Sequence, residues 1–387
     1  MSVPRRLCRM LCLLALASPA AADVTGRFVV RLGLDTTGVE SYTRSGARLE
    51  VNQVGRAPRV LRRHIVADLQ GGGMKHFSLV VTPPGADAPT QTIEAGFEGD
   101  SLRCDVKNGT NPPSRTSVAL DAGSLIVASS SPWSSYEIAL ERLVKGKADT
   151  LGGRMYFVGA GNTERYLLRK LGRDSVEIAN THGDAYRASV DKAGRILGTV
   201  PVAGTQKFSI SRVASLDLDA LAASYAAREK AGAGVGILSP RDTVRVANAG
   251  GASLTIDYGR PAKRGRVVFG ELVPYGDVWR TGANAATQFR TDKALDFGGT
   301  VVPPGFYTLW TLPTAAGWKL IVNGETGQWG TAHKPEKDMF TMDMKVSTLP
   351  QVVERFTISI DPSSSGGVLN LDWDTTRASI AFTVKPD

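Results

Sequence analysis

The residues best suited to binding chemistry gather in one block of the chain, from Tyr258 to Phe289. Five cations stand there among glycines and prolines: Arg260, Lys263, Arg264, Arg266 and Arg280. A guanidinium offers a planar fork of donors that fits a carboxylate or phosphate, and the amide of Asn284 offers a donor and an acceptor to a hydroxyl group. The block therefore predicts a polar pocket.

The candidate side chains for this pocket are Arg266, Trp279, Arg280, Asn284, Trp329 and Glu354. The tryptophans have flat apolar faces on which a sugar can stack. Glu354 is the first candidate partner for Arg280. In an alternative interpretation, Arg280 pairs with Glu354 or Asp277 in the core and only fixes a loop, because structural ion pairs are a common reason for an arginine among apolar residues.

Signatures of known catalytic, cofactor or metal chemistry are not found in the sequence. The histidines are dispersed and lack the spacing of a zinc site: His64, His76, His182 and His333. The sequence has neither a GxSxG elbow before a helix nor a GxGxxG motif opening a βαβ unit. The turn from Arg260 to Arg266 lacks the glycine spacing of a phosphate-binding loop, so a solvated hairpin tip is expected there. We predict no catalytic residue, no metal and no cofactor.

The first 22 residues have the three parts of a secretory signal peptide. Three arginines precede a short apolar run from Leu11 to Ala17, and three alanines before Asp23 provide small residues for cleavage. The apolar run is too short to span a bilayer, and no second long apolar stretch follows it. We therefore expect cleavage near Ala22 and an exported chain, periplasmic or extracellular, without a transmembrane segment.

Charge and cysteine content narrow the possible partners. The formal net charge is +9, and loss of the three leader arginines leaves +6. This mild excess indicates solubility and not a nucleic-acid-binding surface. Two of the three cysteines leave with the signal peptide. The remaining Cys104 has no partner for an internal disulfide and is expected to be an ordinary strand residue.

Alternation of apolar and polar residues predicts an all-β protein with one or two helices. From residue 23 to 215, short alternating segments predict a curved antiparallel meander, or half-barrel. One helix interrupts it, from 134 to 145, where Ser134 and Glu137 have the spacing of a capping box and Gly146 closes the end. We expect its apolar side, which includes Leu140, to pack against the concave face of the sheet.

A helix and a linker divide the chain into two parts. Apolar residues at helical spacing run from 216 to 230, and glycine and alanine dominate residues 231–236. Residues 216–238 are therefore expected to form a helix and a flexible linker. Residues 239–387 contain alternating strands with no helical pattern between them, which predicts a β-sandwich or jelly roll with a core of its own.

Residues 239 to about 384 resemble a bacterial family known as domain of unknown function 2911. Besides the block at 258–289, the family-like segments are Val302–Leu309, Trp318–Asn323, Gln328–Gly330, Asp338, Glu354 and Leu371–Trp373. The resemblance names no reaction. The first part of the chain is similar only in layout to half-barrel-plus-helix domains that hold apolar ligands in bacterial envelopes, so an apolar ligand is one expectation there.

Two classes of function follow from the sequence. The favoured one is a non-enzymatic binding or envelope-associated protein that recognises a small polar or glycan-like ligand. The alternative is a secreted hydrolase with a carboxylate–arginine site at Arg280, Asn284 and Glu354. Clustering of these side chains in an open cleft beside an acid of raised pKa favours the hydrolase, whereas burial of all three in a satisfied network favours a structural role.

Overall fold

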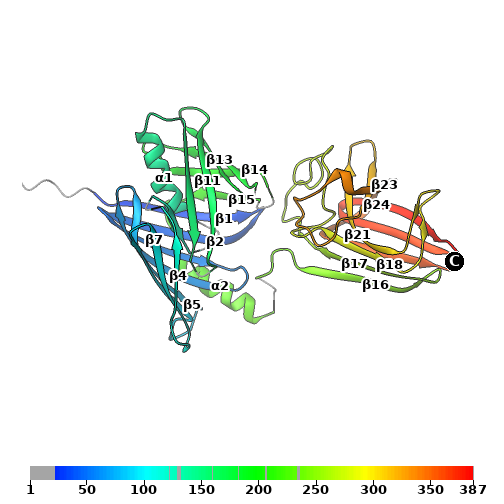
Figure 1. The fold of residues 1–387 in the computed structure, drawn as a ribbon, viewed down its shortest axis with the longest axis horizontal. Coiled ribbons are helices and arrows are strands. Elements are labelled where there is room, and N and C mark those ends of the chain that lie inside the picture. Colours follow the sequence, from blue (N-terminus) through cyan, green and yellow to red (C-terminus); the bar gives the residue numbers. More distant parts are fainter. Residues whose placement is uncertain are drawn as a thin grey trace, which may run out of the picture.

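The computed structural model describes residues 22–386 except 122, 129–131, 159, 182, 205–206 and 233–235. The expected signal peptide up to residue 21 and part of the expected linker lie outside the described residues. Within them, the chain is all-β with few helices, as predicted. Its strands form a 15-stranded sheet and a 9-stranded sheet, and no strand of one sheet pairs with a strand of the other among the described residues (Figure 1).

The N-terminal sheet is a meander that grows in both directions from its central strand β1. The strand order is β8-β7-β6-β5-β4-β3-β2-β1-β15-β14-β13-β12-β11-β10-β9. Neighbours are antiparallel except β9 and β10, which run parallel. The strands are β1 (Val24–Leu32), β2 (Asp35–Ser45), β3 (Arg48–Gly55), β4 (Leu61–Gln70), β5 (Gly73–Thr82), β6 (Gln91–Glu98), β7 (Ser101–Asn108), β8 (Ser114–Ala119), β9 (Leu125–Val127), β10 (Thr150–Phe157), β11 (Asn162–Lys170), β12 (Ser175–Asn180), β13 (Ala185–Val190), β14 (Ile196–Ala203) and β15 (Phe208–Arg212).

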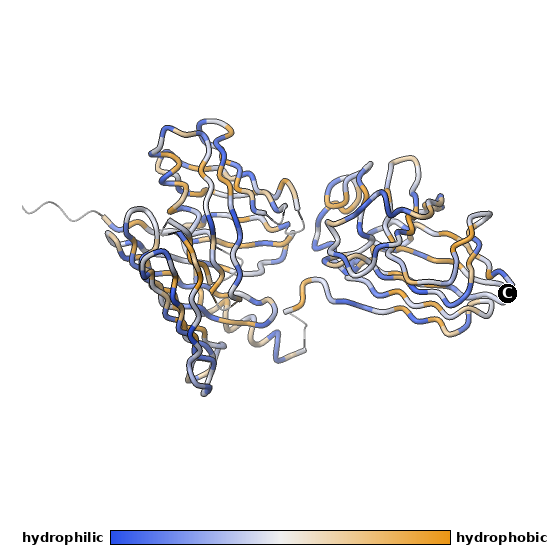
Figure 2. The backbone as a smooth tube through the Cα atoms, in the orientation of Figure 1, coloured by the Kyte–Doolittle hydropathy of each residue, from blue (hydrophilic) through white to orange (hydrophobic). Residues whose placement is uncertain are grey.

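The sheet curls without closing, and helix α1 (Trp133–Lys145) packs against it (Figure 1). Alternate strand residues supply the main apolar core, which Figure 2 displays as alternating colours along the strands. Leu140 of α1 is fully buried in this core. The cavity left beneath the start of α1 is about 10 Å³, no more than the roughly 10–15 Å³ that a cavity needs to hold one water molecule. The helix therefore fills the space beneath its own start, and the apolar ligand expected in the N-terminal part stays a prediction.

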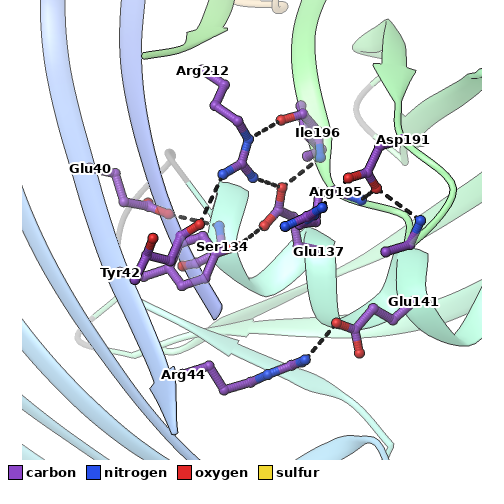
Figure 3. Close-up of polar contacts among 12 residues, drawn as sticks. Glu40, Tyr42, Arg44, Ser134, Glu137, Glu141, Asp191, Arg195, Ile196 and Arg212 are labelled. Atoms are coloured by element: carbon purple, nitrogen blue, oxygen red, sulfur yellow. Dashed lines mark hydrogen bonds and ion pairs between the residues drawn. The ribbon is translucent and has the colours of Figure 1, made fainter. Parts of the chain in front are cut away.

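The capping box predicted at Ser134 and Glu137 does not form, because both residues lie inside α1 and no side-chain cap bond is made at its start. A carboxylate from another element takes this role. The backbone N of Ser134 donates to Oε1 of Glu40, a fully buried residue of β2, at 2.7 Å (Figure 3). Nε2 of Gln53 donates to the other oxygen of Glu40, also at 2.7 Å. The start of α1 is thus fixed by the sheet and not by its own sequence.

Glu137 faces the sheet and joins α1 to three strands. Its carboxylate accepts hydrogen bonds from the hydroxyl of Tyr42, from the guanidinium of Arg212 and from the backbone N of Ile196 (Figure 3). Burial raises the pKa of Glu137, and the bonds from Tyr42 and Arg212 oppose that rise. Because an unpaired carboxylate here would be costly, Arg212 and Tyr42 are needed to keep Glu137 in the interior.

Helix α2 (Leu218–Lys230) covers the opposite face of the N-terminal sheet. Asp217 caps it by accepting a bond from the backbone N of Ala220 at 2.8 Å. Tyr225 and Ala222 are buried with valines of β1, β2 and β3 in a second, smaller core. None of the helices in the described ranges is long and apolar enough to cross a membrane.

The C-terminal sheet has the strand order β16-β17-β18-β21-β22-β23-β24-β19-β20. The two long strands allow it to fold over itself as a sandwich, because β23 pairs with β22 through its first part and with β24 through the rest. The bounds are β16 (Arg241–Ala249), β17 (Ala252–Gly259), β18 (Thr287–Thr291), β19 (Leu295–Asp296), β20 (Val301–Val302), β21 (Gly305–Pro313), β22 (Trp318–Asn323), the 3-10 helix η1 (Pro335–Lys337), β23 (Asp338–Ser363) and β24 (Gly366–Val384). Tyr258 joins the two layers, since its ring meets Phe356 edge-on and its hydroxyl accepts from the backbone N of Ile358 at 3.0 Å.

Candidate ligand-binding site

The arginine-rich block connects β17 to β18 as a long shaped loop. Short backbone pairings hold it: for example, Trp279 exchanges backbone bonds with Thr311 at 2.7 and 2.8 Å, and the backbone N of Gly330 donates to the carbonyl of Asn284 at 2.9 Å. Thr281 and Asn284 adopt positive φ values of 51° and 63°, a conformation that is uncommon for residues other than glycine. The loop therefore turns sharply on both sides of Gly282.

Trp279 belongs to the apolar core and lines a cavity at the same time. It is 8% exposed, and its ring stacks on Trp373 with centroids 5.8 Å apart and an interplanar angle of 19°. Its Nε1 donates to the carbonyl of Gly282 at 3.2 Å. Because Trp373 already covers a face of Trp279, this ring is poorly placed to stack on a sugar.

The cavity has a volume of about 420 Å³ and lies where the block faces the end of the N-terminal sheet. Its lining includes three cations, Arg266 and Arg280 from the block and Lys207 from the segment before β15. Apolar side chains from both parts of the chain, among them Leu32 and Leu272, complete the walls. Asp277 is the one carboxylate among the lining residues that the structure describes.

Arg280 is the most unusual group in this cavity. Its Nε is buried and has no hydrogen-bond partner among the described residues, and its guanidinium makes no ion pair with any of them. Burial lowers the pKa of Arg280 to about 10, and only the charge of Asp184, in the loop before β13, opposes that effect. Its stem lies against Gly330, where any side chain would clash with it. Position 330 therefore requires glycine, because the side chain of Arg280 passes directly over it.

The expected pairing of Arg280 with Glu354 does not form among the described residues. Oε1 of Glu354 instead accepts from the backbone N of Arg264 at 2.8 Å, and Glu354 does not line the cavity. The reason is local: β23 brings Glu354 beneath the turn at Lys263 and Arg264, so its carboxylate is used to hold that turn.

The other cations of the cavity repel one another. Burial and the neighbouring charge of Arg264 lower the pKa of Arg266 to about 10. Burial also lowers the pKa of Lys207, and the charges of Arg280 and Arg266 lower it further. Arg266 is held by bonds to the carbonyls of Lys263 and Ala262, at 2.9 and 2.6 Å, and not by a carboxylate. The cavity is therefore a concentrated positive site with few negative groups.

The structure brings four of the six predicted residues to this cavity: Arg266, Trp279, Arg280 and Asn284. Trp329 is 52% exposed and does not line it, although the next residue, Gly330, does. Lys207 was not predicted. No local sequence signal identifies it, because it reaches the cavity only through the packing of the two parts of the chain.

The turn from Arg260 to Arg266 is not the solvated hairpin tip that we expected. The side chain of Arg264 is only 9% exposed, pairs with Asp35 and donates to the carbonyl of Leu238 at 3.0 Å. The backbone N of Leu34 donates to the carbonyl of Arg264 at 3.0 Å, and any side chain at Gly33 would clash with that carbonyl. The turn therefore docks the C-terminal sandwich onto the N-terminal sheet and sets the walls of the cavity.

Groups of three or more metal-ligating side chains are not found in the parts of the chain that the structure describes. His182 lies outside those parts. Cys104 is buried in the N-terminal core, and burial raises the pKa of its thiol. A raised pKa disfavours the reactive thiolate.

The C-terminal sandwich, which supplies one wall of the cavity, matches the model of a known family. Residues 239–382 match the family described as Protein of unknown function (DUF2911). The match confirms the resemblance seen in the sequence. The DUF2911 segment includes Arg266, Trp279, Arg280 and Asn284, whereas Lys207 and Leu32 lie outside it.

No curated protein matches this chain. Among solved structures, the N-terminal part is loosely similar to a β-barrel-like protein of domain of unknown function DUF1849 from Brucella abortus, with 9% identity, a TM-score of 0.35, and coverage of 49% of this chain and 94% of that chain. A transferrin binding protein B from Neisseria meningitidis is similar at 9% identity and a TM-score of 0.13, with coverage of 95% of this chain and 77% of that chain.

Proposed function

We propose that this protein is an exported, non-enzymatic binding protein that holds a small organic anion in the cavity at Arg280. The observation that carries the proposal is the buried Nε of Arg280, which has no partner among the described residues. A buried guanidinium without a carboxylate is costly, and an anionic ligand would supply the missing acceptors. The sequence of residues 1–22 supports export.

The composition of the cavity supports an anion that also has an apolar part. Arg280, Arg266 and Lys207 supply charge, while Leu32, Leu272 and the edge of Trp279 supply apolar contact. A volume of about 420 Å³ lies within the range of roughly 300–1,000 Å³ that is typical of small-molecule sites. A carboxylate or phosphate group on a small apolar or sugar-like body fits these walls.

A hydrolase is less well supported. The cavity lining, as far as the structure describes it, contains no histidine or cysteine, and its one carboxylate, Asp277, is exposed. Glu354, the acid of the alternative hypothesis, is occupied by the backbone of Arg264. A general acid or base must reach the reacting atoms, but Glu354 does not line the cavity and Asp277 is exposed.

The proposal is tested by the thermal stability of the mature chain with and without small organic anions. The probes are benzoate, glucuronate and glycerol phosphate, each compared with its uncharged counterpart: benzyl alcohol, glucose and glycerol. A ligand present at a hundred times its Kd stabilises the folded state by about 2.7 kcal/mol. We expect stabilisation by at least one anion and none by its uncharged counterpart.

Arg280→Ala should abolish that stabilisation and lower the free energy of unfolding far less than the loss of a buried ion pair would, because the side chain has no ion-pair partner among the described residues. Arg290→Ala, at an exposed arginine of β18, is the matched control and should retain it. A decrease of about 3–5 kcal/mol in Arg280→Ala without any anion dependence would instead indicate a structural ion pair.

A further inference from the structure

A second, smaller cavity of about 150 Å³ lies at the end of the N-terminal sheet near Leu238. Residues of β1, β2 and β3 form its walls, and Arg63 of β4 and Arg56 also line it. It shares no lining residue with the cavity of Arg280. The two are neighbours, since Phe208 and Leu238 line the smaller one whereas Lys207 and Ser239 line the larger.

Arg63 stands on a strand face that is otherwise apolar. On β4 it points to the same face as Leu61 and Ile65, which are both buried in the main core of the N-terminal sheet. Burial lowers the pKa of Arg63, and no charged residue contributes to that shift. A cation on the core side of a sheet normally requires a carboxylate.

No hydrogen bond or ion pair connects the guanidinium of Arg63 to any residue that the structure describes. Its neighbour Arg62 differs, because Arg62 pairs with Asp219 of α2 on the other face of the sheet. Beside Arg63, Gly55 is close enough that a Cβ there would stand 3.5 Å from Nη1 of Arg63. The guanidinium therefore lies along the backbone of β3, with no hydrogen-bond acceptor among the described residues.

The other polar groups of the cavity add positive charge or hydrogen-bonding capacity. Nη2 of Arg56 lies 3.3 Å from Oδ2 of Asp35, which also pairs with Arg264. One carboxylate is thus shared between two arginines. Gln53 is held in place by its bond to Glu40. A small anion beside Arg63 would receive charge-assisted hydrogen bonds and would balance the excess positive charge.

We propose that Arg63 and this cavity form a second anion-binding site, which takes a small oxyanion such as phosphate, sulfate or a short carboxylate. The volume of about 150 Å³ is sufficient for a single small oxyanion. The planar fork of Arg63 matches two oxygens of such an ion. This site does not depend on the function proposed for the cavity of Arg280.

The test is titration of the full mature chain with inorganic phosphate and, separately, with acetate, at an ionic strength held constant with potassium chloride. The readout is the amide resonances of Gly38 and Gly55, which line this cavity and not the larger one. We expect saturable shifts of both resonances with one or both probes. Phosphate alone would define a tetrahedral ligand, and acetate alone would define a carboxylate.

Arg63→Gln should weaken the binding seen at Gly38 and Gly55 by at least about tenfold, and Arg63→Lys, which keeps the charge but loses the fork, should weaken it less. Arg62→Gln is the matched control, and both it and Arg280→Gln should leave the two resonances responsive. Arg63→Gln is expected to fold, because it removes a half-buried charge that has no ion-pair partner among the described residues. Unshifted Gly38 and Gly55 in the natural chain, or equal titration curves in Arg63→Gln, would overturn the proposal.

Discussion

Glu40 is a carboxyl group with no exposed surface, placed between the first turn of α1 and the amide of Gln53 (Figure 3). Burial raises its pKa from an ordinary value of 4.5 to about 7, even though hydrogen bonds from Ser134 and Gln53 act in the opposite direction. The negative charge of Glu137 on the same helix adds to the rise. Glu40 therefore changes its protonation state close to neutral pH.

This shift predicts a pH-dependent stability. The folded chain binds the Glu40 proton more tightly than the unfolded chain, because its folded pKa is the higher one. The contribution of Glu40 to the free energy of unfolding is largest below about pH 4.5. It falls as the pH rises toward 7 and is lost above that value. The total change is on the order of 3 kcal/mol. Urea unfolding at several pH values between 5 and 8 measures it.

Glu40→Gln should remove this contribution to the pH dependence, because the amide keeps the shape of the carboxyl group without a titrating proton. Glu50→Gln, at an exposed position of β3, should retain it. Equal pH slopes for the natural chain and Glu40→Gln would contradict the assignment.

The sequence predicted the residues of the block that line the cavity more accurately than it predicted the partners of those residues. The density of cations and the Trp279–Asn284 segment indicated a polar pocket, and four of the six candidates line one cavity. Glu354 was wrongly paired with Arg280, because the choice between Arg280 and the backbone of Arg264 depends on where β23 passes. Lys207 and Asp184 could not be predicted, since they approach Arg280 from the other sheet.

At the scale of elements, α1 and α2 illustrate what local sequence determines. The helical spacing of apolar residues predicted both helices, and Asp217 caps α2 by a local bond. The capping box of α1 was misread because Ser134 and Glu137 have the right spacing but serve tertiary contacts, to Glu40 and to Arg212. Spacing alone cannot distinguish a glutamate that caps its own helix from one that holds the helix to a sheet.

The packing of α1 predicts a large cost for shortening its central leucine. Leu140 is fully buried in the N-terminal core, so Leu140→Ala should lower the free energy of unfolding by roughly 2–5 kcal/mol. Lys145→Ala, at a side chain that is 78% exposed in the same helix, should change it by about 0.5 kcal/mol or less. Urea unfolding followed by tryptophan fluorescence, to which Trp133 of α1 contributes beside the five tryptophans of residues 239–387, measures both. A similar small effect from the two variants would mean that α1 does not pack as described.

At the scale of the whole molecule, the two sheets meet through polar contacts and not through a shared core. Arg264 pairs with Asp35, the backbone of Leu34 bonds to Arg264, and the cavity of Arg280 lies beside this junction. Every apolar core cluster draws its buried residues from one part of the chain only. Alternation in the sequence predicted the strands on each side. It could not predict the docking, because Asp35 and Arg264 are 229 residues apart.

Because the two sheets have separate apolar cores, we predict that residues 237–387 fold when expressed alone. Their main core contains buried residues from Ala249 to Phe382 and none from the N-terminal sheet. The fragment lacks Asp35, the ion-pair partner of Arg264 at the junction, but it also lacks the N-terminal sheet that covers Arg264, so no buried unpaired charge remains in it. We expect a β-type circular dichroism spectrum and a cooperative thermal transition. A shorter fragment from residue 287 onward should fail to fold, because it lacks Leu254, Ile256 and Tyr258 of β17, which are buried in that core. A disordered spectrum for 237–387 would mean that the N-terminal sheet is required to complete the sandwich.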